Sequence, residues 1–303
     1  MTALTIAQTP INIKDINPGY ESAIPNFDNS NIVFQDKIYF AADDGEHGIE
    51  LWMTDGTEEG TELVKDINEG TGDSECQNFY IVGGRLLFTA NSAAGFELWQ
   101  TDGTTAGTEM VKDIWPGASS AFTDLVNNNQ YFYVWNDVLY FNAKDGQVGW
   151  ELWRSDGTDS GTFLLKDIHN AFGDLGHSFS KSYAEYNGKL YFASRGPGID
   201  EELYVTDGTT AGTNLVVNIA SSGSSSPDDL VVCNGWLLIS ADQNGDRELF
   251  RSDGTAAGTE VVTLINPNGD ALITSPNTFE DRFSCIRDII LFSADDGTNG
   301  REL

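Results

Sequence analysis

The sequence predicts an all-β protein, a six-bladed β-propeller built from four-stranded antiparallel blades. Three observations lead to this fold class. A motif that opens with Glu-Leu recurs at residues 50, 97, 151, 202, 248 and 302, so its copies stand 46 to 54 residues apart. Each interval contains four short apolar segments separated by turn residues, and no interval shows helical periodicity. A four-stranded antiparallel unit repeated at about this length is the signature of a propeller blade.

The second repeat shows the four expected strands in order. They are NFYIVGG (78–84), RLLFTAN (85–91), FELWQTDG (96–103) and TEMVKDI (108–114). Asn-Gly and Gly-Gly turns between the first two strands favour the primed hairpin turns, whereas Gln-Asp and Arg-Asp match them less well. The turn recurs as Gln35-Asp36, Gly83-Gly84, Asn136-Asp137, Asn187-Gly188, Asn234-Gly235 and Arg287-Asp288.

A turn of the form Asp-Gly-Thr-x-x-Gly-Thr joins the third and fourth expected strands. In the first repeat we expect both glycines, Gly56 and Gly60, to adopt positive φ. The aspartate and threonine side chains can bond nearby backbone amides, as in Asx and ST turns. We therefore assign a structural role in these turns to Asp55, Asp102, Asp156, Asp207 and Asp253.

The sixth copy of the motif runs only as Arg301-Glu302-Leu303, so its repeat lacks a fourth strand. Near the other end, INIKDINPG from Ile11 matches the fourth strands LVKDINEG (63–70) and MVKDIWPG (110–117). We expect residues 11–16 to join the last blade and close the ring, which removes exposed sheet edges. The chain then forms one propeller over 1–303, with blades at 31–67, 78–114, 131–168, 182–219, 229–265 and 283–303 plus 11–16.

These strings resemble the bacterial ELWxxDGT repeat family over almost the entire chain. Tyr204 and Phe250 replace the tryptophan in the fourth and fifth copies. The resemblance implies a propeller-like repeat protein that is extracellular or on the cell surface, and it carries over no catalytic residue. Because the start of the chain has no secretory signal, either a leader or flanking region lies outside this sequence or the protein is cytoplasmic.

Composition argues against several classes of function. The formal net charge is −31, and phosphate binding needs a cationic surface, so we expect no nucleic-acid partner. No apolar run approaches the roughly 20 residues of a membrane span, so we expect no membrane insertion. Cys76, Cys233 and Cys285 show no CxxC spacing, which argues against a zinc site or a disulfide framework. We interpret Cys233 and Cys285 as small apolar residues inside strands.

The recurring glutamate has a functional and a structural interpretation. A carboxylate beside Leu and Trp in an interior strand is costly unless it accepts hydrogen bonds. It could belong to a ring of metal or substrate ligands, or it could bond backbone amides or a turn hydroxyl. Active sites are usually unique, so the copies favour a structural role for Glu50, Glu97, Glu151, Glu202, Glu248 and Glu302. The same reasoning makes Trp52, Trp99 and Trp153 packing residues between blades.

The candidate binding face consists of the loops from second to third strand and from fourth strand to the next repeat. These loops are long and varied, and variation on a rigid scaffold is where binding usually resides. Asp-rich Gly loops can supply oxygen ligands for calcium, although none fits an EF-hand, and solvated turns are the alternative. The candidate metal ligands are Asp43, Asp44, Asp145, Asp242, Asp295 and Asp296.

Aromatic residues and a histidine in the same loops are the candidate ligand-binding residues. They could bind a cationic or sugar-like ligand, or they could pack the loops onto the blades. They are Tyr20, Trp115, Phe122, Phe172 and His177. Asp174 and His177 also form a weak candidate catalytic pair, because an isolated Asp/His pair is a poor signal.

Two main functions stay open. The leading one is a non-enzymatic binding or scaffold module, monomeric and with no required cofactor, that binds a protein, a glycan or a cation through the loop face. Near-identical repeats without a unique catalytic set motivate it. The alternative is an enzyme with its site at the mouth of the central channel, with or without calcium, where carboxylates and His177 supply acid and base groups. A purely architectural spacer is a third interpretation.

Overall fold

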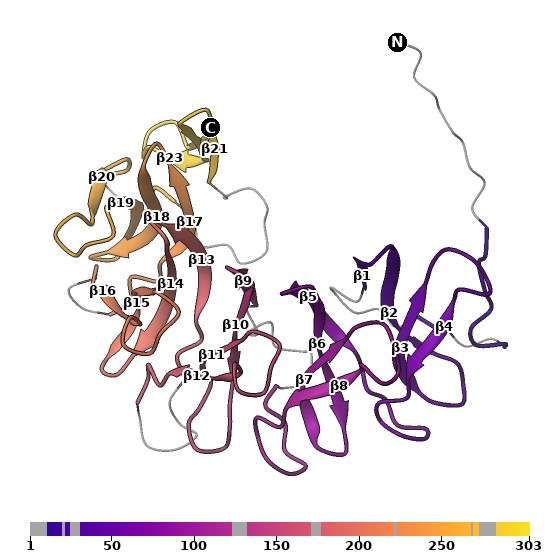
Figure 1. Cartoon of the computed structure of the whole chain (residues 1–303). Coiled ribbons are helices and arrows are strands. Elements are labelled where there is room, and N and C mark those ends of the chain that lie inside the picture. The colour runs from indigo at the N-terminus through magenta and orange to yellow at the C-terminus, as the bar shows by residue number, and fades with distance from the viewer. Residues whose placement is uncertain are drawn as a thin grey trace, which may run out of the picture. The chain divides into compact units, whose positions relative to one another are not determined.

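The computed structural model describes residues 11–19, 22–24, 31–122, 132–170, 177–220, 223–267, 269–272 and 283–303. The described part is all β, with five four-stranded antiparallel sheets and two two-stranded ladders, and it has a β-propeller-like repeat architecture (Figure 1). It holds no helix with the length and apolar character needed to cross a membrane. The chain divides into two compact units, residues 1–121 and 122–303.

The first unit contains two complete blades, and in each the strands pair in chain order. The first blade comprises β1 (Asn31–Phe34), β2 (Lys37–Asp43), β3 (Ile49–Thr54) and β4 (Glu62–Lys65). The second comprises β5 (Gln77–Val82), β6 (Arg85–Ser92), β7 (Gly95–Thr101) and β8 (Glu109–Lys112).

The second unit contains three complete blades with the same pairing order. Their strands are β9 (Tyr133–Trp135), β10 (Val138–Ala143), β11 (Glu151–Ser155) and β12 (Phe163–Lys166); β13 (Lys181–Tyr186), β14 (Lys189–Gly196), β15 (Ile199–Thr206) and β16 (Asn214–Val217); and β17 (Asp228–Cys233), β18 (Trp236–Gln243), β19 (Asp246–Ser252) and β20 (Glu260–Thr263).

The sixth repeat forms two short ladders in the second unit. β21 (Ser284–Ile286) pairs with β22 (Ile289–Leu291), and β23 (Ala294–Asp295) pairs with β24 (Arg301–Glu302). Ala294 faces Glu302, as Ala90 faces Glu97 in the second blade. The ladders therefore reproduce the first-to-second and second-to-third pairings of a complete blade.

The two-residue turns between first and second strands share one conformation. Both turn residues have positive φ in all six copies, including Gln35-Asp36 (50° and 62°) and Arg287-Asp288 (50° and 64°). The less suitable sequences therefore adopt the same primed turn as Gly83-Gly84, because the strands on both sides fix the hairpin twist.

The Asp-Gly-Thr turns are also identical in geometry. In the first blade Asp55 Oδ1 accepts the Thr57 amide at 2.9 Å and the Thr57 hydroxyl at 2.7 Å, and the Thr57 hydroxyl oxygen accepts the Gly60 amide at 2.9 Å. Gly56 has φ +89°, but the expectation of positive φ at Gly60 was wrong. Gly60 is required for another reason: a Cβ there would overlap the Asp55 carboxylate.

The core lies between successive blades inside each unit. In the first unit one buried cluster joins Tyr39, Leu51 and Val64 of the first blade to Phe88 and Trp99 of the second. The motif tryptophans Trp52, Trp99 and Trp153 are buried, with 5–7% exposure, and Trp99 belongs to this cluster. Trp52 packs with Phe40 and Ala42 in a separate cluster. Burial of this kind stabilises a sheet by roughly 25 cal/mol per Å² of apolar surface.

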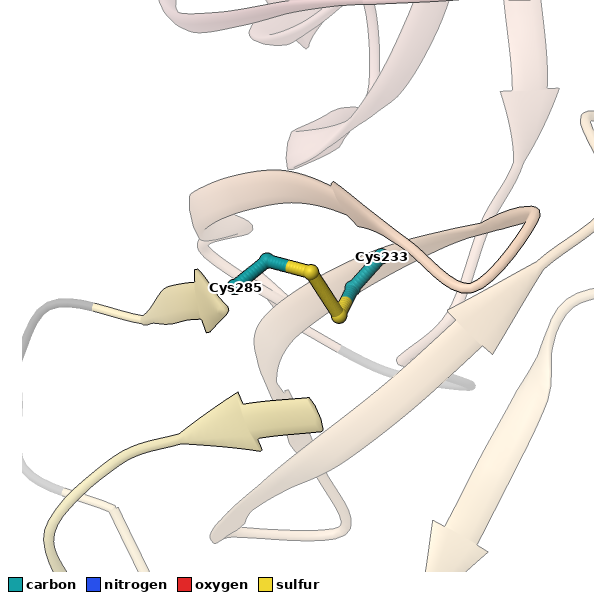
Figure 2. The surroundings of a disulfide bond; sticks show 2 residues. All are labelled: Cys233 and Cys285. Carbon is teal, nitrogen blue, oxygen red and sulfur yellow. A yellow bond between two sulfur atoms is a disulfide. The ribbon is translucent and has the colours of Figure 1, made fainter. Parts of the chain in front are cut away.

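The cysteines correct a sequence-based expectation. Cys233 at the end of β17 and Cys285 in β21 form a disulfide with a Cα–Cα distance of 5.6 Å, so they are not free apolar fillers (Figure 2). The remaining cysteine, Cys76, is a buried free thiol. Sequence spacing missed the bond because its partners lie 52 residues apart and meet only when successive repeats stack.

Residues 11–16 lie outside the strands of the described structure, so they do not form a strand as expected. They nevertheless contact the first blade. Lys14 Nζ donates to the Thr61 carbonyl oxygen at 2.6 Å, and Ile16 packs against Phe40, Ala42 and Trp52. Closure of a ring by this segment stays a prediction.

Candidate functional site

The motif glutamates are buried hydrogen-bond acceptors. Glu50 Oε2 accepts the Ile67 amide at 2.7 Å, and Glu97 Oε2 accepts the Ile114 amide at 2.8 Å. Glu151, Glu202 and Glu248 accept the equivalent amide 17 residues downstream. The carboxylate therefore ties the end of the fourth strand to the third strand of its own blade, which is the structural interpretation. Glu302 differs from these five because it is exposed.

Burial changes the acid–base properties of these glutamates. It raises the pKa of Glu97 to about 8 and the pKa of both Glu50 and Glu151 to about 7, although the backbone amides that donate to each carboxylate oppose the shift. Burial also raises the pKa of Glu202 and Glu248. A shifted pKa marks a catalytic candidate only when the group faces a cleft. These groups face backbone amides.

A second capping position lies directly before each glutamate. The amide of this preceding residue donates to a side chain from the following loop, such as Ile49 to Asp73 Oδ1 at 2.8 Å. The third blade uses a histidine, since the Trp150 amide donates to His177 Nδ1 at 3.1 Å. The equivalent acceptors in the other blades are Ser120, Ser224 and Asp270. The position is thus a repeated structural cap filled by different residue types.

His177 therefore has a structural contact where sequence analysis considered catalysis. Its Nδ1 is an acceptor for a backbone amide, and its ring lies 5.1 Å from the ring of Phe179, centroid to centroid. Asp174, the proposed catalytic partner, lies outside the described residues, as do Tyr20 and Phe172.

Of the two remaining aromatic candidates, one is unable to contact a ligand. Phe122 is fully buried and packs against Phe132 and Phe141, with ring centroids 5.9 and 5.6 Å away. Sequence analysis placed Phe122 on a surface loop, but its side chain is buried in the apolar core. Trp115 is half-buried, and its amide lies 3.4 Å from Glu97 Oε1.

The carboxylates of the acidic hairpins accept hydrogen bonds from backbone amides of the same hairpin. Asp44 Oδ1 accepts the amides of Glu46 and His47 at 2.9 Å, and Asp44 Oδ2 contacts His47 Nδ1 at 2.8 Å. Asp296 accepts the amides of Thr298 and Asn299 in the same way. Asp43, Asp145 and Asp295 likewise accept amides two residues ahead. In the ranges that the structure covers, no three His, Cys, Asp or Glu side chains come together as a metal site.

Two acidic candidates border cavities. Asp296 lines one of about 400 Å³. Asp242 lines another, of about 330 Å³. Its Oδ1 lies 3.1 Å from Nε of Arg247, a guanidinium that is almost completely buried. Burial raises the pKa of Asp242, while the neighbouring Arg247 lowers it. Loops after the fourth and fifth blades contribute to the lining, which consists of Ala220, Gly223, Ser224, Asp242, Asn244, Gly245 and Asp270.

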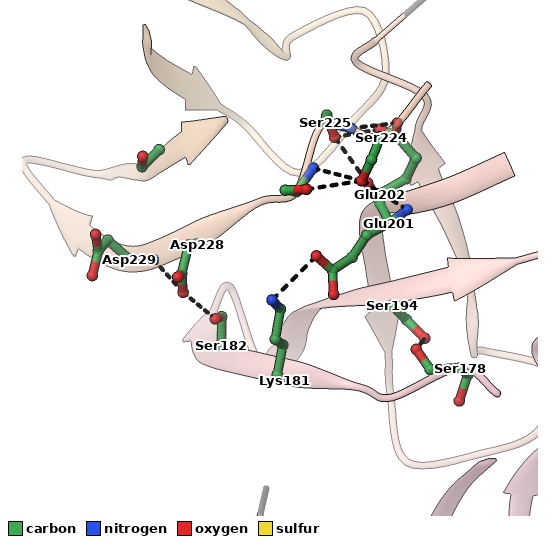
Figure 3. A network of polar contacts seen from close by, with 12 residues as sticks. Ser178, Lys181, Ser182, Ser194, Glu201, Glu202, Ser224, Ser225, Asp228 and Asp229 are labelled. Atoms are coloured by element: carbon green, nitrogen blue, oxygen red, sulfur yellow. Dashed lines mark hydrogen bonds and ion pairs between the residues drawn. The ribbon is translucent and has the colours of Figure 1, made fainter. Parts of the chain in front are cut away.

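Sequence analysis missed the polar contacts of the fourth blade. Lys181 Nζ lies 3.1 Å from Glu201 Oε2 within this blade, and the Ser182 hydroxyl donates to Asp228 of the fifth blade (Figure 3). The Ser225 hydroxyl donates to Glu202 Oε2 at 2.5 Å in the same network. One signal was available: Ser224 and Asp270 each stand 22 residues after the motif glutamate of their blade, one residue less than the 23 that separate Asp73 from Glu50.

No known family model and no curated protein matches the chain. Among solved structures, a puromycin hydrolase mutant is 13% identical with a TM-score of 0.45, and the match covers 93% of this chain and 46% of that one. Oligopeptidase B from Leishmania major is 9% identical with a TM-score of 0.44 over 77% and 32%. TolB from Acinetobacter baumannii is 15% identical with a TM-score of 0.34 over 72% and 50%. The chain thus spans half or less of each of these proteins.

Proposed function

We propose that the chain is a closed six-bladed β-propeller of the ELWxxDGT repeat type that acts as a non-enzymatic binding module. Its ligand, a protein, glycan or cation, contacts the loops between second and third strands and between successive blades. One observation carries the proposal. Within the described residues, the recurring carboxylates and His177 are used as caps inside the blades, whereas Asp242, Asn244 and Gly245 of the β18–β19 hairpin border a cavity of about 330 Å³.

The register of the chain ends supports six blades. β23 and β24 pair as the second and third strands of a complete blade do, and residues 11–16 contact the first blade as a fourth strand contacts its neighbour. Completion of the last blade by residues 11–16 also protects an edge that would otherwise favour aggregation.

The cavity beside Asp242 supports binding at the loop face. Its walls are mainly polar, with Asp242, Asp270 and Ser224 around it. A rim of this composition, on a chain with a net charge of −31, favours a ligand that presents cationic or hydroxyl groups.

The alternative of an enzyme at the channel mouth is not favoured by any contact in the described part of the chain. His177 Nδ1 already accepts a backbone amide, so it lacks the free acceptor that a general base needs on that atom.

The disulfide supports an extracellular or cell-surface location. Disulfides persist in oxidising compartments and are rare in the cytosol. The bond between Cys233 and Cys285 therefore agrees with the location that the resemblance implies.

Deletion of residues 1–16 tests ring closure. The truncated protein should aggregate or unfold at a lower temperature, because the last blade loses its fourth strand. A truncated protein that melts like the parent would contradict closure.

Glycan and peptide arrays, each with and without calcium, test binding. A ligand found there should be lost in Asp246→Lys, since Asp246 is exposed at the start of β19 beside the cavity hairpin. Glu58→Lys is the matched control, because it makes the same charge change in an exposed third-to-fourth turn. Equal loss in both variants would indicate charge alone, and the absence of any ligand would count against a binding module.

A further inference from the structure

One contact recurs in all five complete blades: the motif glutamate accepts the amide of the residue 17 positions later. The leucine after this glutamate is buried in every case, with 0–4% exposure at Leu51, Leu98, Leu152, Leu203 and Leu249. In the sixth repeat Glu302 is exposed and Leu303 is 92% exposed. The sixth repeat therefore has the acceptor of this contact, the motif glutamate, but no fourth strand whose amide could donate to it.

The N-terminal segment carries the other half of the contact. Lys14 donates to the Thr61 carbonyl oxygen at 2.6 Å, as Lys65 donates to the Thr108 carbonyl oxygen at 2.7 Å. This equivalence places Ile16 at the position of Ile67. The Ile67 amide donates a hydrogen bond to the Glu50 carboxylate.

Apolar packing gives the same register. Ile16 lies against Phe40, Ala42 and Trp52. Ile67 belongs to the cluster that contains Phe88, Ala90 and Trp99, which are the corresponding residues of the next blade.

The loop after residue 16 fixes the register a third time. The Asp43 amide donates to the Ala23 carbonyl oxygen at 2.7 Å, as the Asn91 amide donates to the Ser74 carbonyl oxygen at 2.8 Å. Ala23 stands seven residues after Ile16, and Ser74 stands seven residues after Ile67. After the first blade the Ser74 amide donates to the Ile49 carbonyl oxygen. Ile49 pairs with Asp43 as Arg301 pairs with Asp295, so Arg301 corresponds to Ile49.

The receptor side has matching space. A cavity of about 400 Å³ with mainly apolar walls lies beside Glu302 and Leu303, lined also by Ile265, Ile290, Leu291 and Phe292. On the donor side Ile13 is 40% exposed, whereas Val64 at the corresponding position is 3% exposed. Ile11 corresponds to Glu62, which is exposed in the complete first blade.

We propose that Glu302 is the docking residue for the chain's own N-terminal segment. Its carboxylate accepts the amides of Ile16 and Asn17, the Arg301 carbonyl accepts the Ala23 amide, and Ile13 enters the apolar cavity against Leu303. The proposal rests on the closed ring proposed above and adds its register. The interaction is strand addition, in which the backbone supplies affinity and alternate side chains supply specificity.

Two measurements on the full chain test it together. Energy transfer between dyes at the N-terminus and at residue 298 reports whether the ends meet. Hydrogen exchange of the Ile16 and Asn17 amides reports the specific contact. In Glu302→Ala we expect exchange of these two amides to accelerate about 10- to 100-fold, since each bond to a charged acceptor is lost. Glu58→Ala, in an exposed turn of the first blade, should leave both amides unchanged.

A second pair of variants tests the register without the carboxylate. Ile13→Asp should reduce the energy transfer, because it places a charge in the apolar cavity, while Ile11→Asp should not. The register would be wrong, and the closed ring would still stand, if the chain ends meet but amide exchange does not respond to Glu302→Ala. The same holds if Ile11→Asp and Ile13→Asp reduce the energy transfer equally. Ends that stay apart, or energy transfer only between different molecules, would overturn both.

Discussion

Lys14 Nζ and the carbonyl oxygen of Thr61 lie 2.6 Å apart, and this contact joins a segment outside the strands to the first blade. Lys65 and Thr108 make the same contact at 2.7 Å between two complete blades. A lysine at the end of a fourth strand thus reaches the third-to-fourth turn of the next blade. The N-terminal segment keeps this contact even though it pairs with no strand in the described structure.

The buried glutamates predict a pH-dependent stability. The pKa values of Glu50 and Glu151 are raised to about 7 and that of Glu97 to about 8. Between about pH 4.5 and these values, the folded state holds protons that the unfolded state has lost. The free energy of unfolding should therefore fall as the pH rises from 4.5 towards 8.

Urea unfolding at several pH values measures this effect. Salt at about 1 M shortens the Debye length to about 3 Å and suppresses the general repulsion of an acidic chain. The decline should be shallower in Glu97→Gln, which cannot titrate. A stability that is flat or rises over this interval, or equal slopes in both proteins, would show that the glutamates do not cause it.

The Asp-Gly-Thr turn predicts a coupling between two residues of the second blade. A Cβ at Gly107 would overlap the Asp102 carboxylate, and Gly107 does not have positive φ. Gly107→Ala should therefore destabilise the protein by about 1–3 kcal/mol through overpacking. In an Asp102→Ala background the same substitution should add little, because the clash is gone. A double-mutant cycle by urea unfolding checks it, and additive effects would refute the steric explanation.

The disulfide predicts a loss of stability on reduction. Cross-linking Cys233 to Cys285 restricts the unfolded chain, and such a bond typically contributes about 2–4 kcal/mol. Reductant should lower the urea midpoint and should first increase hydrogen exchange in residues 283–303. The Cys233→Ser/Cys285→Ser variant should have the lower midpoint already and ignore reductant. A reduced protein with an unchanged midpoint would contradict this role.

Local sequence was sufficient for the repeat and its turns. Gly-Gly and Asn-Gly predict the primed hairpin turns. In the structure Gln35-Asp36 and Arg287-Asp288 also adopt positive φ, although their sequences match such turns less well. Local sequence did not reveal why residue 60 is glycine. The reason is that a Cβ there would overlap the Asp55 carboxylate, and this depends on how the carboxylate lies over the turn.

The candidate site was less predictable. Asp44 and Asp296 looked like metal ligands because composition shows only that carboxylates are near, and not which amides they accept. His177 looked like a catalytic residue because its counterparts, Asp73 and Ser120, are different residue types at one geometric position. Phe122 looked like a loop residue, but it is part of a buried aromatic group.

The sequence by itself determined the all-β class, the four-stranded unit and the structural role of the motif glutamate, because these depend on contacts within one repeat. Only the tertiary structure decided the disulfide, the caps at His177 and Asp270, and the cavity beside Asp242. These features arise where the loops and edges of successive repeats meet. The chain spacing of such groups, 52 residues for the two cysteines, carries no local signal of their proximity.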